Sequence, residues 1–347
     1  MLNAAINRFN QIRKTKHLNN PLFLTQKKYA FIGVGMHSLA NFYPLLHYFN
    51  INLKYIYTKS SGSGAQLKKQ FPACTFTHNL SDILNDKDVE GVFVCSTPSS
   101  HFSILQALAD AGKKIFIEKP PCQSLHELEM LISKKSLEIC KVGFQRRYWP
   151  GNNVIAKKIK KAKSYCYNFL FGSYISGDPY TELFIHALDY CLFLFGECKI
   201  LSVNVVKDSS GETLHLHVKH NEGISGLIEA STHFSWNKPQ DKLTINCPEE
   251  TIEVSYPKSV RGFQKPTRFL NIPTERLLHQ PEITKDYFST GNNILPTWDL
   301  NTLVVQGFYN EVEAFIVLVE NADQHIIKND LPGLLPLYKM LHQITSR

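Results

Sequence analysis

The chain has 347 residues, 43% hydrophobic and 20% charged, which is typical of a globular protein long enough for two well-packed domains. The formal net charge is +8, but residues 1–28 carry six Lys or Arg and no acid, so most of the excess lies in one segment and does not indicate a nucleic-acid partner. No apolar run reaches the length of a membrane span, and no secretory signal pattern follows the basic segment.

Residues 1–28 form a basic leader. Its apolar residues follow helical spacing and are Leu2, Ala5, Ile6, Phe9 and Ile12. The pattern predicts an amphipathic helix that docks on the protein's own body or on a second subunit, with a membrane surface or a targeting role as the alternative.

From residue 29 to about 144, apolar runs alternate with helical patterns. The predicted strands are Tyr29–Ile32, Leu53–Thr58, Cys74–Thr77, Val92–Cys95, Ile115–Ile117 and Ile139–Gly143. The predicted helices begin near Ser38, Gly62, Ser81, Ser99 and Ser124, where serine suits the N-cap in four of the five. This alternation predicts an α/β domain over residues 29–150, with a doubly wound parallel sheet of the Rossmann type.

The pattern changes after residue 150 to strands with few helices between them. These predicted strands are Lys163–Gly172, Ile200–Lys207, Thr213–His220, Gly226–Thr232, Lys242–Cys247 and Thr251–Tyr256. They predict an α+β domain over residues 151–330, built on an open-faced, mostly antiparallel sheet. Helices are expected at Pro179–Phe195, Thr302–Glu320 and 331–347, and Arg261–Pro296 is expected to be a long loop or a subunit arm.

Neither metal binding nor nucleic-acid binding is expected. The eight cysteines lack CxxC spacing and are predicted to be reduced core thiols of a cytoplasmic protein. His215 and His217 share one strand face without a third ligand, which favours a solvent face or a subunit contact over a metal site. The basic run 157–163 lacks interleaved aromatic residues, which favours a solvated helix face.

A glycine-rich turn follows the first strand and opens a helix, the context of a dinucleotide-binding fingerprint. Gly33 permits the tight turn, and Gly35 lets the backbone approach a pyrophosphate at the helix N-terminus. Met36 and His37 complete the turn, and Ser38, which is small enough for close packing, replaces the third glycine. The turn predicts that all five residues bind a nicotinamide dinucleotide.

Two further strand ends are expected to reach the same cofactor. The second strand ends in Thr58-Lys59-Ser60, which favours NADP over NAD because hydroxyls and an ammonium can hold a 2′-phosphate; the alternative is a solvent-facing turn. Thr97 and Pro98 end the fourth strand where the chain passes the cofactor's central part. His101 either contacts the cofactor or caps the following helix.

The segments AFIGVGMHS, CSTPSSH, AGKKIFIEKPP and GFQRRYWP, in this order, resemble the Gfo/Idh/MocA family of NAD(P)-dependent oxidoreductases that act on sugars, inositols and sugar nucleotides. The resemblance runs from about Tyr29 to the C-terminus and is specific in the first domain and loose in the second. It implies that Lys119 lies beside the nicotinamide and the substrate hydroxyl, and that Glu118 and Pro120 shape a turn whose proline bond is often cis. It also implies a homodimer or homotetramer that pairs through the second sheet.

The family's second catalytic element is an Asp-x-x-x-His helix, to which Glu182 and His186 correspond here. Helical spacing puts Glu182, His186 and Asp189 on one face. His186 then suits a general acid or base, Asp189 could orient it, and Glu182, one methylene longer than the family's aspartate, is expected to bind substrate. A solvated polar stripe remains an alternative, and zinc is disfavoured because Lys119 would repel it.

The segment Gln145-Arg146-Arg147-Tyr148 corresponds to a family segment in which an arginine commonly faces substrate, and Arg147 is favoured over Arg146. Together these features predict a cytoplasmic oxidoreductase that transfers hydride between NADP, or NAD, and a carbinol or keto carbon of a carbohydrate-like substrate. The alternative is a regulatory or scaffold protein that keeps the fold and cofactor but has lost turnover.

Overall fold

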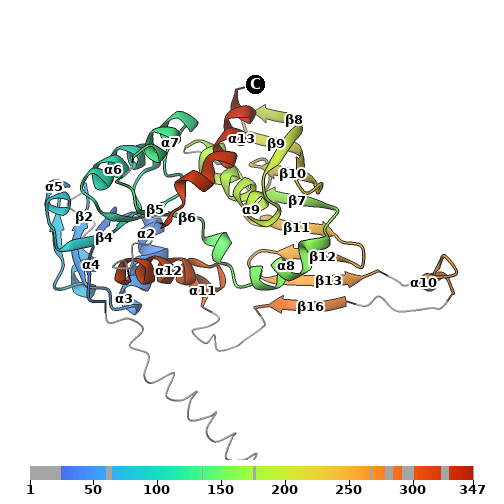
Figure 1. Ribbon diagram of the computed structural model, residues 1–347, viewed down its shortest axis with the longest axis horizontal. Helices are drawn as coiled ribbons and strands as arrows, with labels where there is room; N and C mark the ends of the chain where they lie inside the picture. Colours follow the sequence, from blue (N-terminus) through green and yellow to red (C-terminus); the bar gives the residue numbers. More distant parts are fainter. Residues whose placement is uncertain are drawn as a thin grey trace, which may run out of the picture.

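A computed structural model describes residues 25–59, 65–134, 136–174, 177–265, 268–277, 284–290, 301–321 and 328–346. The predicted leader helix therefore lies outside the described residues. Two sheets dominate the fold and are joined by the helices between them (Figure 1). None of the described helices is long and apolar enough to cross a membrane.

The first sheet is parallel, with seven strands in the order β17-β6-β5-β4-β1-β2-β3. Its strands are β1 Lys28–Ile32, β2 Leu53–Tyr57, β3 Thr75–Thr77, β4 Val89–Val94, β5 Lys114–Glu118, β6 Ile139–Gly143 and β17 Lys328–Asn329. Central strands such as β1 and β4 are buried almost throughout because helices cover both faces. The predicted doubly wound sheet is confirmed, with all six predicted strands in place.

The connecting helices of this domain are α2 Met36–Asn41, α3 Tyr43–Tyr48, α4 Ala65–Gln70, α5 Ser81–Leu84, α6 Pro98–Asp110 and α7 Leu125–Ile132. Of the four serines predicted as N-caps, only Ser124 caps its helix, where its hydroxyl accepts from the backbone amide of Glu127 at 3.2 Å. Ser38, Ser81 and Ser99 lie within helices that begin at or before them. Periodicity indicates that a helix is present, whereas the residue at which the helix begins depends on local contacts.

The second sheet has eight strands in the order β16-β13-β12-β11-β7-β10-β9-β8. Its strands are β7 Ser164–Leu170, β8 Cys198–Asp208, β9 Gly211–His220, β10 Ser225–Ser231, β11 Gln240–Asn246, β12 Glu250–Ser255, β13 Ser259–Gln264 and β16 Thr284–Ser289. Only the β7–β10 pair is parallel, so the predicted mostly antiparallel sheet is confirmed. On β9, Leu214, Leu216 and Val218 are buried, as the alternation predicts.

Three short helical elements lead from β6 of the first sheet to β7 of the second, and two more lead from β7 to β8. They are the 3-10 helices η1 Gln145–Tyr148 and η2 Ile159–Lys161, helix α8 Asn152–Lys158, the π-helical turn η3 Tyr180–Phe184 and helix α9 Ile185–Phe195. The predicted single helix Pro179–Phe195 is thus a π turn followed by an α-helix. Such turns widen the helix locally and often accompany functional sites.

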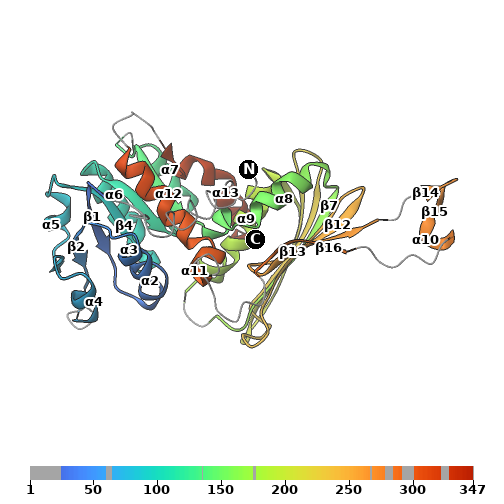
Figure 2. The ribbon, with the colours of Figure 1, turned by 90° about the horizontal axis from the view of Figure 1, so that it is seen from below.

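The segment predicted as an irregular loop contains regular structure. Strands β13 and β16 extend the second sheet, and β14 Arg268–Phe269, β15 Ile272–Pro273 and α10 Thr274–Leu277 form a small unit that stands away from the rest of the molecule (Figures 1 and 2). Pro266 and Pro273 interrupt the apolar pattern, which is why periodicity missed the paired strands.

The C-terminal part of the chain returns to the first domain. Its elements are α11 Thr302–Val305, α12 Phe308–Glu320, β17, η6 Leu331–Leu334 and α13 Leu335–Thr345. Helix α12 packs Phe308, Val312 and Phe315 into the core of the first sheet, and β17 pairs with β6. Helix α12, which the sequence analysis assigned to the second domain, thus packs on the first sheet, and burial against a distant sheet leaves no local sequence signal.

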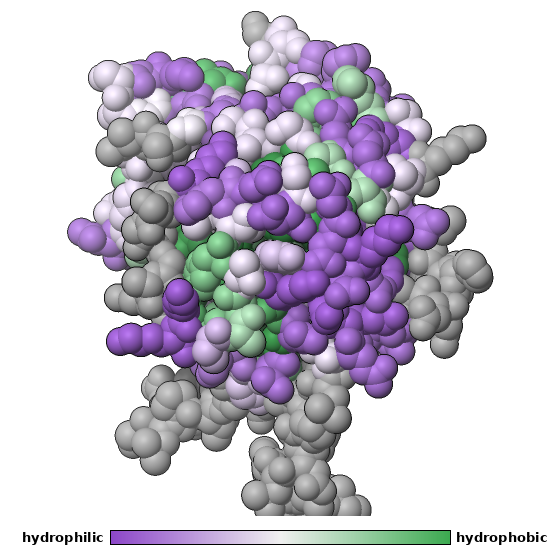
Figure 3. Space-filling view, turned by 90° about the vertical axis from the view of Figure 1, so that its left-hand side faces the viewer, coloured by the Kyte–Doolittle hydropathy of each residue, from purple (hydrophilic) through white to green (hydrophobic). Residues whose placement is uncertain are grey.

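The surface of the first domain is mostly polar (Figure 3), and the cysteines are unpaired. Seen from the side of the first domain, the molecule is mostly hydrophilic, with small hydrophobic areas between charged and polar side chains (Figure 3). All eight cysteines are free thiols, and five of them are buried. This agrees with the predicted reduced core thiols.

Candidate active site

A cleft of about 610 Å³ lies at the carboxyl ends of β1, β2 and β4. The predicted cofactor residues that line it are Gly33, Gly35, Met36, His37, Ser38, Thr58, Lys59, Thr97 and Pro98. Three strand ends therefore meet at one edge, as expected for a ligand site of a doubly wound sheet. Ser60 lies outside the described residues.

The glycine-rich turn has the backbone geometry of a dinucleotide site. Gly33 has φ of 113°, and a Cβ there would lie 2.1 Å from the carbonyl oxygen of Cys95. A Cβ on Gly35 would meet no atom within 4 Å, so this backbone is open to a ligand. The buried Ser38 hydroxyl accepts from the Gly35 amide and donates to the Gly35 carbonyl, both at 2.9 Å. Ser38 thus closes the turn, and the residues present fit a dinucleotide.

One residue that lines the cleft, His37, contacts Glu118 at the end of β5. His37 Nε2 lies 3.7 Å from Glu118 Oε2. Glu118 is buried, and its other oxygen has no hydrogen-bond partner and lies against Gly143, where a Cβ would come within 2.6 Å of it. The contact between His37 and Glu118 thus links the glycine-rich turn to the turn that holds Lys119.

His101 braces the turn after Lys119. Its ring is buried on α6, with Nδ1 2.7 Å from the Pro120 carbonyl oxygen and Nε2 3.0 Å from the Ser96 carbonyl oxygen. His101 is not among the residues that line the cleft, and its side chain does not cap α6. Its two bonds instead hold the Ser96 and Pro120 backbone together, and a cofactor contact of His101 stays a prediction. The Lys119–Pro120 peptide bond is cis, as the family resemblance implied.

Lys119 bridges the two domains. Its Nζ donates a hydrogen bond to the Glu182 carbonyl oxygen in η3, at 2.5 Å. Burial lowers the pKa of Lys119, while the carboxylates of Glu118 and Glu182 act in the opposite direction. The ammonium group is therefore fixed at the junction between the first domain and the π-helical turn.

His186 lies in the first turn of α9. Burial holds the pKa of its imidazole well below the ordinary value, and the positive charges of Lys119 and Arg146 add to this shift. Its Nδ1 is buried without a hydrogen-bond partner. The same surroundings make the imidazole a weaker base, and the acid or base function of His186 stays a prediction.

Glu182 has an oriented carboxylate in η3. The hydroxyl of Tyr174 donates to Oε2 at 2.8 Å, and the amide of Asp178 donates to Oε1 at 3.3 Å. Each carboxylate oxygen can accept a further hydrogen bond. Its side chain thus keeps the capacity to bind substrate hydroxyls although glutamate replaces the family's aspartate.

Asp189 and Arg147 form an ion pair with each other. The buried Asp189 carboxylate accepts from Arg147 Nε at 2.9 Å and also from Arg147 Nη2. The Nδ1 of His186 has no hydrogen-bond partner, so it is not bonded to Asp189. Arg147 and Asp189 neutralise each other and tie η1 to α9. The orientation of His186 by Asp189 and the substrate contact of Arg147 stay predictions.

Arg146 is the arginine nearer the site, since its charge acts on both Lys119 and His186. It is buried, donates through Nη1 to Asp241, and lies 4.1 Å from the ring centre of Tyr256. The sequence analysis favoured Arg147, because no local signal shows that the partner of Arg147 lies on α9 and that of Arg146 on β11.

A buried acid beside the site was missed by sequence reasoning. Glu311, on α12, is 1% exposed, and neither of its carboxyl oxygens has a hydrogen-bond partner. Burial and the charge of Glu118 raise its pKa well above the ordinary value. No local signal could have found it, since its charge sits in an ordinary amphipathic helix pattern.

No group of three His, Cys, Asp or Glu side chains suited to a metal ion occurs in the part of the chain that the structure describes. His215 Nε2 lies 3.8 Å from Glu229, and His217 Nε2 lies 3.0 Å from the Ser225 hydroxyl.

Comparison with known proteins adds a family match to this geometry. Residues 27–143 match a family model described as an oxidoreductase family with an NAD-binding Rossmann fold. A myo-inositol 2-dehydrogenase of Thermotoga maritima is 26% identical over 180 residues, which cover 43% of this chain and 52% of that protein. An uncharacterized oxidoreductase of Bacillus subtilis is 36% identical over 76 residues, 21% of this chain and 22% of the relative. The sequence matches thus span between about a fifth and a half of these relatives.

Solved structures extend the fold match to nearly the whole chain. A dehydrogenase from Chromobacterium violaceum has a TM-score of 0.77 at 16% identity, covering 93% of this chain and 95% of that one. A UDP-N-acetylglucosamine 3-dehydrogenase from Acidithiobacillus ferrooxidans has a TM-score of 0.70 at 16% identity, covering 92% and 96%. At such identities the likeness establishes the shared two-domain fold.

Proposed function

We propose that this chain, whose first domain is an NAD-binding domain of the Gfo/Idh/MocA oxidoreductase family, transfers hydride between a nicotinamide dinucleotide and a carbinol or keto carbon of a carbohydrate-like substrate. The observation that carries the proposal is the position of Lys119, held between the cofactor cleft and the His186 helix by the bond from its Nζ to the Glu182 carbonyl. The inositol dehydrogenase among the relatives supports a polyhydroxylated substrate class.

The nicotinamide would supply the carbon that accepts or donates the hydride. Gly33, Gly35 and Ser38 would hold the pyrophosphate at the start of α2. In the oxidation direction, the Lys119 ammonium binds the substrate hydroxyl oxygen and stabilises the alkoxide that develops on it. His186, neutral because of its surroundings, accepts the hydroxyl proton. In reduction the imidazolium returns that proton to the oxygen.

The proposal is tested by Lys119→Ala and His186→Ala. Each substitution removes a group that contacts the reacting oxygen, and turnover should fall by about two decades or more. Dinucleotide binding, followed by fluorescence titration, should stay near normal because the glycine-rich turn is intact. Lys134→Ala removes a partly buried lysine that pairs with Asp110 and serves as the control. Full activity in both site variants would refute the assignment.

We propose NADP as the preferred dinucleotide. Thr58 and Lys59 line the cleft at the end of β2, and neither brings a carboxylate that would repel a 2′-phosphate. Titration with NADPH and NADH should show tighter binding of NADPH, and Lys59→Ala should reduce the difference. Tighter NADH binding in the unaltered protein would contradict this preference.

Two properties of the whole protein complete the proposal. We propose a homodimer or homotetramer that pairs through the outer face of the second sheet, where Leu201, Val206 and Leu227 are about half exposed. Sedimentation analysis would give the oligomeric state. A cytoplasmic location is supported by the free thiols. The alternative of a scaffold without turnover is less favoured, since Lys119 and His186 are both retained at the site.

A further inference from the structure

His37 lies at the point where the glycine-rich turn meets the cofactor cleft. It is the one histidine among the described residues that line the cleft, and Lys59 is the one lysine. The same described residues include no Asp, Glu or Arg. Each phosphate in the diphosphate of a nicotinamide dinucleotide carries a negative charge. Lys59 and a protonated His37 are therefore the side chains of this wall that can offset that charge.

The ring of His37 has a defined orientation. Asn41, at the end of α2, has its Nδ2 3.0 Å from His37 Nδ1, and His37 Nε2 lies 3.7 Å from Glu118 Oε2. The rings of Phe42 and Phe308 pack edge-on against it, each with its centre 5.8 Å from that of the imidazole. Because an amide nitrogen donates, Nδ1 accepts in the neutral ring. The ring proton then lies on Nε2, which faces Glu118.

The same surroundings also suit a protonated ring. A protonated Nδ1 would donate, and the Asn41 amide can turn its oxygen toward it, because the two ends of an amide have nearly the same shape. Nε2 would then form a charge pair with the buried Glu118 carboxylate, which a nearby cation stabilises. About half of the His37 side chain is exposed, so solvent can supply the proton.

Three further charged or titratable groups surround this ring. Lys119 donates its Nζ proton to a backbone carbonyl in η3, and the sign of its charge disfavours a second cation at His37. Glu311 is buried on α12, the helix that packs against the ring, and its ionised form would favour that cation. His186 lies on α9, and a charge on His37 lowers the pKa of its imidazole. A proton on His37 thus also favours the neutral form of His186.

We infer that His37 takes up a proton from solvent when the dinucleotide binds, so that its imidazolium offsets the diphosphate charge while it pairs with the Glu118 carboxylate. The inference rests on the proposed oxidoreductase function and adds a proton to its cofactor-binding step. A ligand that favours the protonated ring binds more tightly where the ring is protonated, so the affinity falls as pH rises. For one proton, the fall is at most about tenfold per pH unit.

Fluorescence titration with NADPH and with NADH at pH 6 and pH 8 tests the inference. The Kd of the unaltered protein should be about fivefold or more higher at pH 8 than at pH 6. His37→Gln cannot carry a charge and should bind weakly at both pH values, whereas His37→Lys carries a fixed charge and should bind more tightly than His37→Gln at pH 8. The 2′-phosphate of NADPH titrates at about pH 6, but it is common to all variants and cancels in the ratio of their Kd values.

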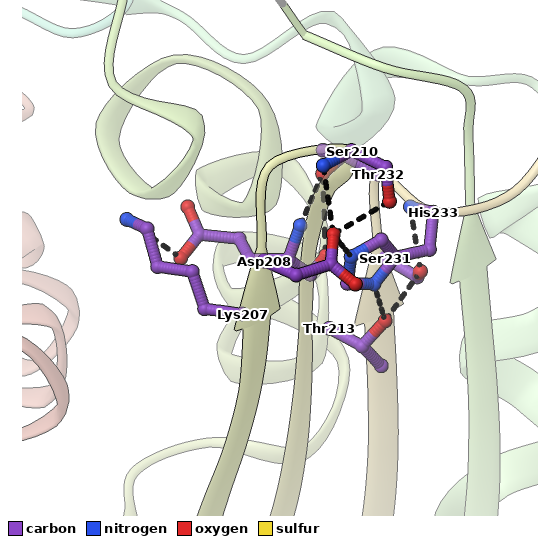
Figure 4. A network of polar contacts seen from close by, with 8 residues as sticks. Lys207, Asp208, Ser210, Thr213, Ser231, Thr232 and His233 are labelled. Atoms are coloured by element: carbon purple, nitrogen blue, oxygen red, sulfur yellow. Dashed lines mark hydrogen bonds and ion pairs between the residues drawn. The ribbon is translucent and has the colours of Figure 1, made fainter.

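His233 provides a matched control, because it is also a histidine that faces a carboxylate. Its Nε2 lies 3.2 Å from Asp208, and its Nδ1 lies 2.9 Å from the Thr213 hydroxyl (Figure 4). It follows β10 of the second sheet and is not among the described residues that line the cleft. His233→Gln should therefore keep the pH dependence of the unaltered protein.

A direct readout follows the proton itself. Mixing the unaltered protein with NADH or NADPH in weakly buffered solution at pH 7, with a pH indicator, should show proton uptake on binding. The uptake should be smaller in His37→Gln by the part that belongs to His37, and unchanged in His233→Gln.

The inference and the proposed function fail in different ways. If neither dinucleotide binds to the unaltered protein at either pH, both are wrong. If a dinucleotide binds but its Kd has the same pH dependence in His37→Gln as in the unaltered protein, only the inference is overturned. The titrating group would then lie elsewhere, for example at His78, whose Nδ1 is 2.5 Å from the carbonyl oxygen of Thr58. Loss of the pH dependence in His233→Gln would overturn the inference as well.

Discussion

The buried Glu311 carboxyl makes the stability of the protein depend on pH in a defined direction. Its neighbours are the acids Glu118 and Asp330, which raise its pKa, and Lys141 and the Phe144 amide, which act in the opposite direction. Burial is the largest influence and raises the pKa well above 4.5. The folded state therefore binds a proton that the unfolded state releases near pH 4.5.

The sign follows from this difference in bound protons. Above about pH 4.5 the unfolded chain holds fewer protons at this group than the folded chain, so stability falls as pH rises toward the folded pKa. A difference of one bound proton changes the free energy of unfolding by about 1.4 kcal/mol per pH unit, which is the steepest fall that this group can cause between pH 5 and the folded pKa. Glu311→Gln imitates the protonated carboxyl and should abolish this loss.

Urea unfolding at pH 5, 6 and 7 checks the prediction. The free energy of unfolding of Glu311→Gln should match that of the unaltered protein at pH 5 and exceed it increasingly at pH 6 and 7. Glu129→Gln changes an exposed glutamate on α7 and should leave the pH dependence unaltered. The same pH slope in Glu311→Gln and the unaltered protein would refute the reasoning, as would a lower stability of the variant at pH 7.

Two further predictions concern the domain junction and the cofactor turn. Arg146→Met should lower the free energy of unfolding in urea by about 3–5 kcal/mol, because it leaves the largely buried Asp241 without its charge partner. The double variant Arg146→Met/Asp241→Leu should lose clearly less. Equal losses in the two variants would argue against the importance of the pair. Gly33→Ala should abolish dinucleotide binding in a fluorescence titration, because its φ of 113° and the contact of a Cβ with the Cys95 carbonyl exclude a side chain. Gly112→Ala is the matched control, since Gly112 has φ of 66° and open space around its Cβ position. Normal binding by Gly33→Ala would contradict the geometry of the turn.

Local sequence patterns were sufficient for the first domain and for one half of the candidate site. The strands, the glycine-rich turn and Lys119 at the end of β5 each depend on residues within a few positions of one another. Periodicity and turn chemistry act over that range, which is why Gly33, Gly35 and Ser38 could be predicted to line one cleft.

The hydrogen-bond partners of residues that lie far apart in the chain could not be predicted from local patterns. Asp189 shares a helix face with His186 by spacing, yet its carboxylate bonds to Arg147. His101 could be placed near the cofactor by sequence, but its ring bonds to the carbonyl of Pro120. The partner of a buried side chain depends on which distant residue packs against it. Several residues can lie opposite one helix face, so spacing alone does not identify the partner.

The sequence by itself determined the two-sheet architecture, the dinucleotide turn and the identity of Lys119 and His186 as the chemical candidates. Only the tertiary structure decided how they are held: the π-helical turn that gives Lys119 a carbonyl partner, the neutralised arginines, and the return of α12 with Glu311. The physical reason is that periodicity encodes which face of an element is buried. The contacts made there arise only when segments far apart in the chain pack together.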